Sequence, residues 1–94
     1  MSINRQTDEI LTVMAEECAE IIMEIMKIKR FGLNTIVPDT KLTNLDKLTK
    51  ELGDFMAMYQ LLHQQKLFKE EQINEYKEQK FEKLKKFSNI KITK

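Results

Sequence analysis

Two pairs of acidic residues repeat one spacing in separate parts of the chain: Glu17 with Glu20, and Glu51 with Asp54. On a helix, residues three apart lie on one face, and at about 100° per residue Glu17 and Glu51 each fall inside an apolar stripe. The second acid of each pair flanks that stripe. Because an unpaired buried carboxylate is energetically costly, four acids placed in this way indicate a bound cation.

The residue types narrow the choice of cation. Carboxylates are hard ligands that favour Mg²⁺, with Mn²⁺ as the second possibility. A di-iron bundle would need Glu-x-x-His on two helices, whereas the one histidine, His63, has Gln60 three residues before it. One cysteine and one histidine are too few for an ordinary tetrahedral zinc site. The acidic pairs therefore predict a magnesium site.

Long helices must position these acids, since the 94 residues include only two glycines and one proline. The helices expected from apolar periodicity cover residues 8–31, about 44–65 and about 69–87. Thr7 is the expected cap of the first helix and Gly32 its end, while Thr43 or Asn44 caps the second. The sequence therefore predicts an all-α fold, an antiparallel bundle of about three main helices.

The whole chain, residues 1–94, is expected to form a single domain with its core at about 7–87 and a tail at 88–94. A helical chain of this length buries so little apolar surface that a monomer would be only marginally stable. Three helices also leave a four-helix bundle incomplete. We therefore expect a homodimer or homotetramer that completes a four-helix-type bundle, with the acidic sites near the subunit contacts.

Charge is unevenly distributed, although the formal net charge is only +1. Residues 1–65 hold seven Lys/Arg against ten Asp/Glu, and residues 66–94 hold nine Lys against five Glu. The interleaved glutamates and the lack of arginine in the basic part argue against nucleic-acid binding. No apolar stretch is long enough for a membrane span, no signal-peptide core is recognisable, and one cysteine suits a reducing compartment. We therefore expect a cytoplasmic protein.

Three segments of the chain resemble one known family. Residues 16–21 (EECAEI) and 50–55 (KELGDF) are similar to the E-E-x-x-E-L and E-L-G-D-hydrophobic signatures of the MazG-like all-α nucleoside triphosphate pyrophosphohydrolases. Residues 80–87 (KFEKLKKF) resemble the C-terminal segment of that family, in which an Asn and then Lys-Leu precede an Arg-aromatic pair, with Lys80 in place of Asn and Lys86 in place of Arg. Lys86 supplies positive charge without the bidentate fork of a guanidinium.

The resemblance implies a Mg²⁺-dependent enzyme that hydrolyses a nucleoside triphosphate between the α and β phosphates, releasing a monophosphate and pyrophosphate. Implied metal ligands and catalytic residues are Glu17, Glu20, Glu51 and Asp54. One of these, or Glu16 or Glu24, would serve as general base. Candidates for binding the phosphates are Lys47, Lys80, Lys83 and Lys86.

Two other functions are compatible with the same residues. A phosphoribosyl-ATP pyrophosphohydrolase has a similar helical four-acid site. A non-catalytic helical interaction protein could carry the acidic face as a docking surface. A panel of nucleotides assayed with and without Mg²⁺ distinguishes all three.

Overall fold

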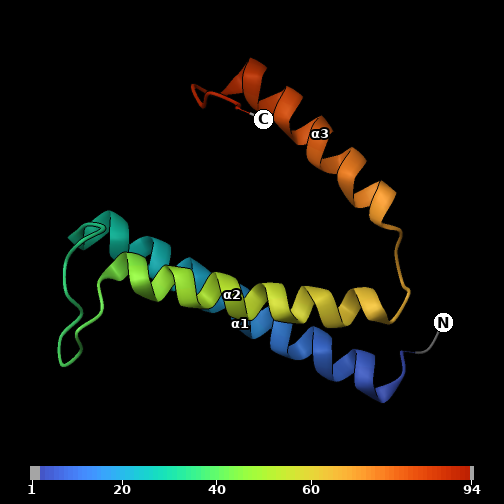
Figure 1. The fold of residues 1–94 in the computed structure, drawn as a ribbon, viewed down its shortest axis with the longest axis horizontal. Helices are drawn as coiled ribbons and strands as arrows, with labels where there is room; N and C mark the ends of the chain where they lie inside the picture. The colour runs from blue at the N-terminus through green and yellow to red at the C-terminus, as the bar shows by residue number, and fades with distance from the viewer. Residues whose placement is uncertain (1–2, 94) are drawn as a thin grey trace.

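The computed structural model describes residues 3–93 and confirms the all-α prediction. It contains three helices: α1 (Arg5–Phe31), α2 (Asn44–Gln64) and α3 (Glu70–Phe87), as Figure 1 shows. The one β feature among the described residues is an isolated antiparallel bridge between Ile36 and Thr43. None of the helices in this part of the chain is long and apolar enough to cross a membrane.

Helix α1 begins earlier than the sequence predicts. Its N-cap is Asn4, whose Oδ1 accepts a hydrogen bond from the Thr7 backbone N–H at 2.7 Å, so the prediction of Thr7 as the cap is wrong. The Thr7 hydroxyl instead donates to Gln65 Oε1 at 2.9 Å, and Thr7 is buried. The side chain that looks like a local cap therefore joins the start of α1 to the end of α2.

The ends of α2 agree with the sequence. Thr43 and Asp46 form a reciprocal capping box, in which the Thr43 hydroxyl accepts from the Asp46 N–H and the Asp46 carboxylate accepts from the Thr43 N–H. The helix is capped at its C-terminal end by Gln65, as expected. Helix α3 also matches its predicted bounds, and residues 88–93 form the expected tail as far as they are described.

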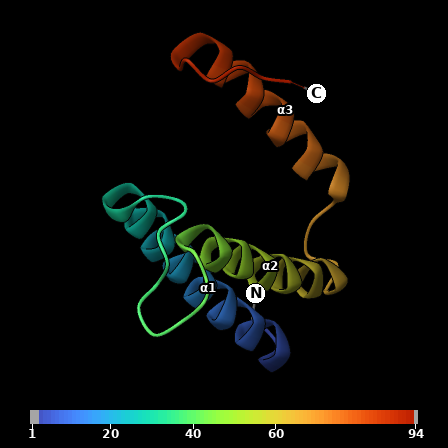
Figure 2. The ribbon, with the colours of Figure 1, turned by 60° about the vertical axis from the view of Figure 1, so that its left-hand side comes forward.

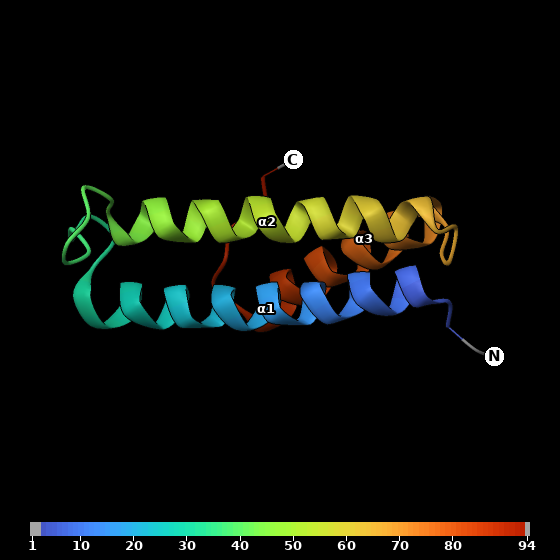
Figure 3. The ribbon, with the colours of Figure 1, turned by 90° about the horizontal axis from the view of Figure 1, so that it is seen from below.

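Helices α1 and α2 form an antiparallel hairpin (Figures 1 and 3). At one end Thr7 bonds Gln65, and at the other the Asn44 side-chain amide donates to the Gly32 carbonyl at 2.9 Å. Gly32 adopts a φ of 99°, a left-handed conformation that glycine reaches without strain. The two tethers fix the register, so that the middle of α1 faces the middle of α2.

The hairpin has a thin core in this single chain. Ile10 is the one hydrophobic residue that is buried among the described residues. The other buried residues are polar: Thr7, Glu24, Asn44 and Glu51. Much apolar surface on both helices is therefore left uncovered.

Helix α3 does not pack along the hairpin but leads away from it (Figures 1 and 2). Residues 65–69 connect it to α2, with Lys66 in a left-handed conformation at φ 59°. No residue of α3 is buried. The bundle within one chain is thus a two-helix hairpin with α3 as a separate arm.

Candidate metal centre

Three carboxylates converge where the middles of α1 and α2 face each other. Glu17, Glu51 and Asp54 each place one oxygen within 4.8 Å of the others. Glu51 is only 7% exposed, and Glu17 and Asp54 are half-buried. The convergence predicted from two separate helices is therefore present for these three acids, and it follows from the register set by the tethers at the hairpin ends.

The environment of Glu17 disfavours its negative charge. Desolvation, a hydrogen bond to the Glu51 carboxyl and repulsion from Asp54 and Glu51 raise the pKa of Glu17 above its ordinary value, against a smaller opposing effect of Lys50. Glu17 Oε2 is also buried and has no hydrogen-bond partner. A carboxyl group with an unpartnered buried oxygen among like charges would gain from a nearby cation.

Lys50 is a functional candidate that the sequence analysis missed. Its Nζ lies 2.8 Å from Asp54 Oδ2 and 3.6 Å from Glu51 Oε1. These two acids raise the pKa of Lys50, so the ammonium stays charged. The side chain is 60% exposed and can leave the acids without disturbing packed structure. The i, i+4 spacing of Lys50 and Asp54 was the available signal for this pair.

The fourth predicted ligand lies outside the cluster. Glu20 is exposed on α1, one turn beyond Glu17, and its carboxylate is not among the three that converge. Glu16, a candidate general base, is likewise exposed. The other candidate base, Glu24, is 3% exposed, with Oε1 3.2 Å from Lys27 Nζ and Oε2 without a partner.

The predicted phosphate-binding lysines are divided between two places. Lys47 is half-buried on α2 and makes no ion pair within residues 3–93. Lys80, Lys83 and Lys86 are exposed on α3. Because α3 does not pack on the hairpin, this chain does not bring them to its own carboxylates.

The donor set suits a hard divalent cation. Three carboxylates offer oxygen only, which matches Mg²⁺ or Mn²⁺. The orphaned buried oxygen of Glu17 is the feature that a bound cation would satisfy. The described residues thus fit a metal ion of this class.

An all-helical fold with carboxylates gathered between two antiparallel helices is the arrangement of a helical protein that could hold a divalent cation. A model of the MazG nucleotide pyrophosphohydrolase domain matches residues 5–88 of the chain. The chain belongs to the MazG nucleotide pyrophosphohydrolase family. Neither curated proteins nor solved structures gave a match.

Proposed function

We propose that this protein is a Mg²⁺-dependent nucleoside triphosphate pyrophosphohydrolase, which cleaves (d)NTPs between the α and β phosphates to give (d)NMP and pyrophosphate. The observation that carries the proposal is the cluster of Glu17, Glu51 and Asp54 in a chain of this family. The supporting feature is the unpartnered buried oxygen of Glu17. Mn²⁺ would be accepted in place of Mg²⁺.

The carboxylates of α1 and α2 would hold the cation. A bound divalent ion supplies charge neutralisation at the phosphates and makes water more acidic. Glu17, Glu51 and Asp54 form the ligand set that is already gathered, and we assign Glu20 as the fourth because it lies on α1 one turn from Glu17 with its side chain free to turn. Because like charges and desolvation raise the pKa of Glu17, a cation held beside it would favour its ionised form, so metal binding at this site would be weaker at low pH.

Lys50 has a separate part in this proposal. In the described structure its ammonium neutralises Asp54 and Glu51. A divalent cation and this ammonium compete for the same carboxylates. With a cation held by these acids, the 60% exposed Lys50 side chain would be free to turn outward and offer its charge to the triphosphate.

A second copy of the chain would cover the exposed apolar side of the hairpin. Leu45, Leu52 and Met56 on α2 and Ile22 and Ile25 on α1 are 41–61% exposed. At about 100° per residue they fall within a sector of about 60° on each helix, away from the acidic sector. Packing two such faces together gives a four-helix bundle made of two chains. This homodimer is the smallest assembly proposed, and two homodimers would form the homotetramer.

The same assembly would supply the missing phosphate contacts. Lys80, Lys83 and Lys86 stand away from the carboxylates of their own chain. We place them at the triphosphate of the partner's site, with Lys47 and Lys50 contributed by the chain that holds the cation. Sharing each site between two chains in this way accounts for a helix α3 that does not pack on the hairpin of its own chain. The lone cysteine, Cys18, is free in the described structure, and we assign the protein to the cytoplasm.

The direct test is pyrophosphate release from a panel of NTPs and dNTPs, with phosphoribosyl-ATP alongside, in Mg²⁺, in Mn²⁺ and in chelator. We expect metal-dependent release from at least one nucleoside triphosphate. Glu20→Gln should reduce it, and Glu9→Gln, on the same helix outside the cluster, should not. Release from phosphoribosyl-ATP alone would identify the other pyrophosphohydrolase. No release and no thermal stabilisation by Mg²⁺ would favour the non-catalytic alternative, a helical interaction protein.

A further inference from the structure

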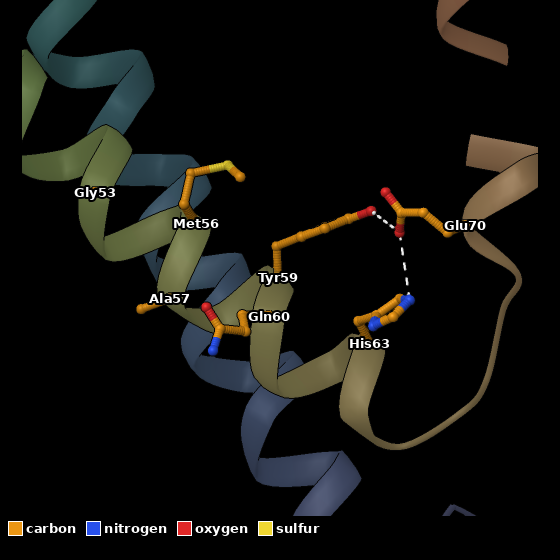
Figure 4. Close-up of a pocket in the computed structure, with 7 residues that line it drawn as sticks. All are labelled: Gly53, Met56, Ala57, Tyr59, Gln60, His63 and Glu70. Atoms are coloured by element: carbon orange, nitrogen blue, oxygen red, sulfur yellow. Dashed lines mark hydrogen bonds and ion pairs between the residues drawn. The ribbon is translucent and has the colours of Figure 1, made fainter. Parts of the chain in front are cut away.

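The start of α3 is held to α2 by contacts that lie outside the acidic site. We call this junction, residues 65–69 with the adjoining helix ends, the elbow. Figure 4 shows Tyr59 and His63, one turn apart on α2, both directed at Glu70 in the first turn of α3. The Tyr59 hydroxyl donates to Glu70 Oε2 at 3.1 Å, and His63 Nε2 lies 3.3 Å from the same oxygen. One carboxylate oxygen therefore joins two side chains of α2 to the arm.

Aromatic rings close the inner side of this elbow. Phe68, in the connecting segment, lies 5.7 Å from the Tyr59 ring and 5.5 Å from the His63 ring between centroids. Tyr59 and His63 are stacked at 6.5 Å. Rings at these separations attract one another beyond their buried area. Phe68 thus fixes the connecting segment against the face of α2 that carries the two Glu70 partners.

An open cavity lies in the angle between α2 and the first turn of α3. Its volume is about 500 Å³, and Met56, Gln60 and Glu70 are among the residues that line it. Empty space on this side means that nothing packed between the helices sets their angle. The contacts that can set this angle are those of Tyr59 and His63 with Glu70 and with the ring of Phe68.

We infer that Glu70 is a positioning residue, which through Tyr59 and His63 fixes the angle of α3 and so the place of the lysines that α3 carries to the triphosphate. The inference rests on the proposed function for its effect on the substrate, but not for the geometry of the elbow. Glu71 provides a matched control because it is the neighbouring acid in the first turn of α3 and is likewise exposed. The burial of Tyr59 and its bond to Glu70 raise the pKa of the phenol, which gives the contact a spectroscopic signature.

The geometry is tested by spin-label distances between one site on α1 and one on α3. Glu9→Cys and Gln79→Cys are exposed positions for the labels, with Cys18→Ala to remove the native thiol. Doubly labelled protein is diluted into unlabelled protein so that distances within one chain dominate. We expect a narrow distribution with Glu70, a clearly broader one in Glu70→Gln, and no change in Glu71→Gln. Equal widths in all three would overturn the inference.

Tyrosine titration reports the same contact independently. The chain has two tyrosines and no tryptophan, so Tyr76→Phe leaves Tyr59 as the one phenol. Glu70→Gln should move the ionisation of Tyr59, followed by its ultraviolet absorbance, to lower pH, and Glu71→Gln should leave it in place. Circular dichroism of each variant checks that helical content is kept, as expected because the Glu70 side chain is about half exposed. An unmoved titration would refute the contact.

Kinetics tests the positioning role. Losing the contacts to one exposed carboxylate should raise the KM for the nucleoside triphosphate by about fivefold, with a smaller effect on kcat, because the lysines bind phosphate in both ground and transition states. A broadened distance distribution with unchanged KM would refute the positioning role and leave the proposed activity intact. Absence of any turnover in the wild type would refute the proposed activity, while the distance and titration experiments would still decide the elbow.

Discussion

Replacing Glu51 by glutamine tests the metal centre most directly, because Glu51 is the buried acid of the cluster at 7% exposure. Glutamine keeps the shape and one carbonyl oxygen but removes the negative charge that a divalent cation needs. We expect pyrophosphate release to fall about 100-fold or more, which corresponds to about 2.7 kcal/mol of lost transition-state stabilisation.

The same substitution should have little effect on metal-free stability. Oxygens of Glu51 and Asp54 lie within 4.8 Å, so at an effective dielectric constant of about 20 their repulsion is about 3 kcal/mol. The Lys50 ammonium, 3.6 Å from Glu51 Oε1, attracts the same carboxylate by a similar amount, and water screens both interactions because Asp54 and Lys50 are 43% and 60% exposed. Because the lost repulsion and the lost attraction offset each other, the metal-free Tm should stay within about 4 °C of that of the wild type, which is about 1 kcal/mol or less for a domain of this size.

The assays are pyrophosphate release in saturating Mg²⁺ and thermal unfolding by circular dichroism in chelator and in Mg²⁺, at one fixed protomer concentration. Mg²⁺ should raise the Tm of the wild type and of Glu9→Gln but not that of Glu51→Gln. Retained turnover in Glu51→Gln would refute the assignment of Glu51 as a ligand. A metal-free Tm of that variant far above or far below that of the wild type would refute this balance of charges.

Three further predictions follow from other parts of the molecule. Because the folded-state pKa of Glu17 is raised, the folded state binds its proton more tightly, so metal-free stability should fall as pH rises through that pKa; Glu17→Gln should flatten this dependence in unfolding curves. If the chain assembles as proposed, Leu52→Glu should dissociate the homo-oligomer in sedimentation velocity. Thr12→Glu, at an exposed position on the polar side of α1, should leave the wild-type size unchanged. Gly32→Ala should destabilise the fold by about 1 kcal/mol or more, because φ at this residue is 99° and the new Cβ would lie 3.3 Å from Thr35 Oγ1. Gly53 is helical and has open space around it, so Gly53→Ala should be neutral or stabilising by about 0.5–1 kcal/mol. Denaturant titrations measure both changes.

Features decided within one turn of the chain could be predicted from the sequence. The capping box of Thr43 and Asp46 is such a feature, because both partners lie within four residues. The inward phase of Glu17 and Glu51 is another, because helical periodicity is local. The family resemblance depends on the same short segments, and the match over residues 5–88 confirms it.

Features that depend on distant partners could not be predicted in this way. Thr7 looks like a helix cap, but its hydroxyl is used by Gln65, 58 residues along the chain. Asn4 was available as the cap but lies before the first apolar residue of the periodic pattern. The ion pair of Lys50 with Asp54 could be predicted from their spacing. Its link to a metal centre could not, because that depends on Glu17 of the other helix lying beside them.

The sequence by itself determined three helices, the faces on which their acids and apolar side chains lie, and the family, because each of these follows from residues within a few turns of one another. The tertiary structure decided which acids meet: the hairpin register brings Glu17 to Glu51 and Asp54 and leaves Glu20 outside. It also decided that α3 leaves the hairpin at the Tyr59–Glu70 contact. An amphipathic helix specifies the face it must bury, but the surface that buries it is set by contacts that close long loops.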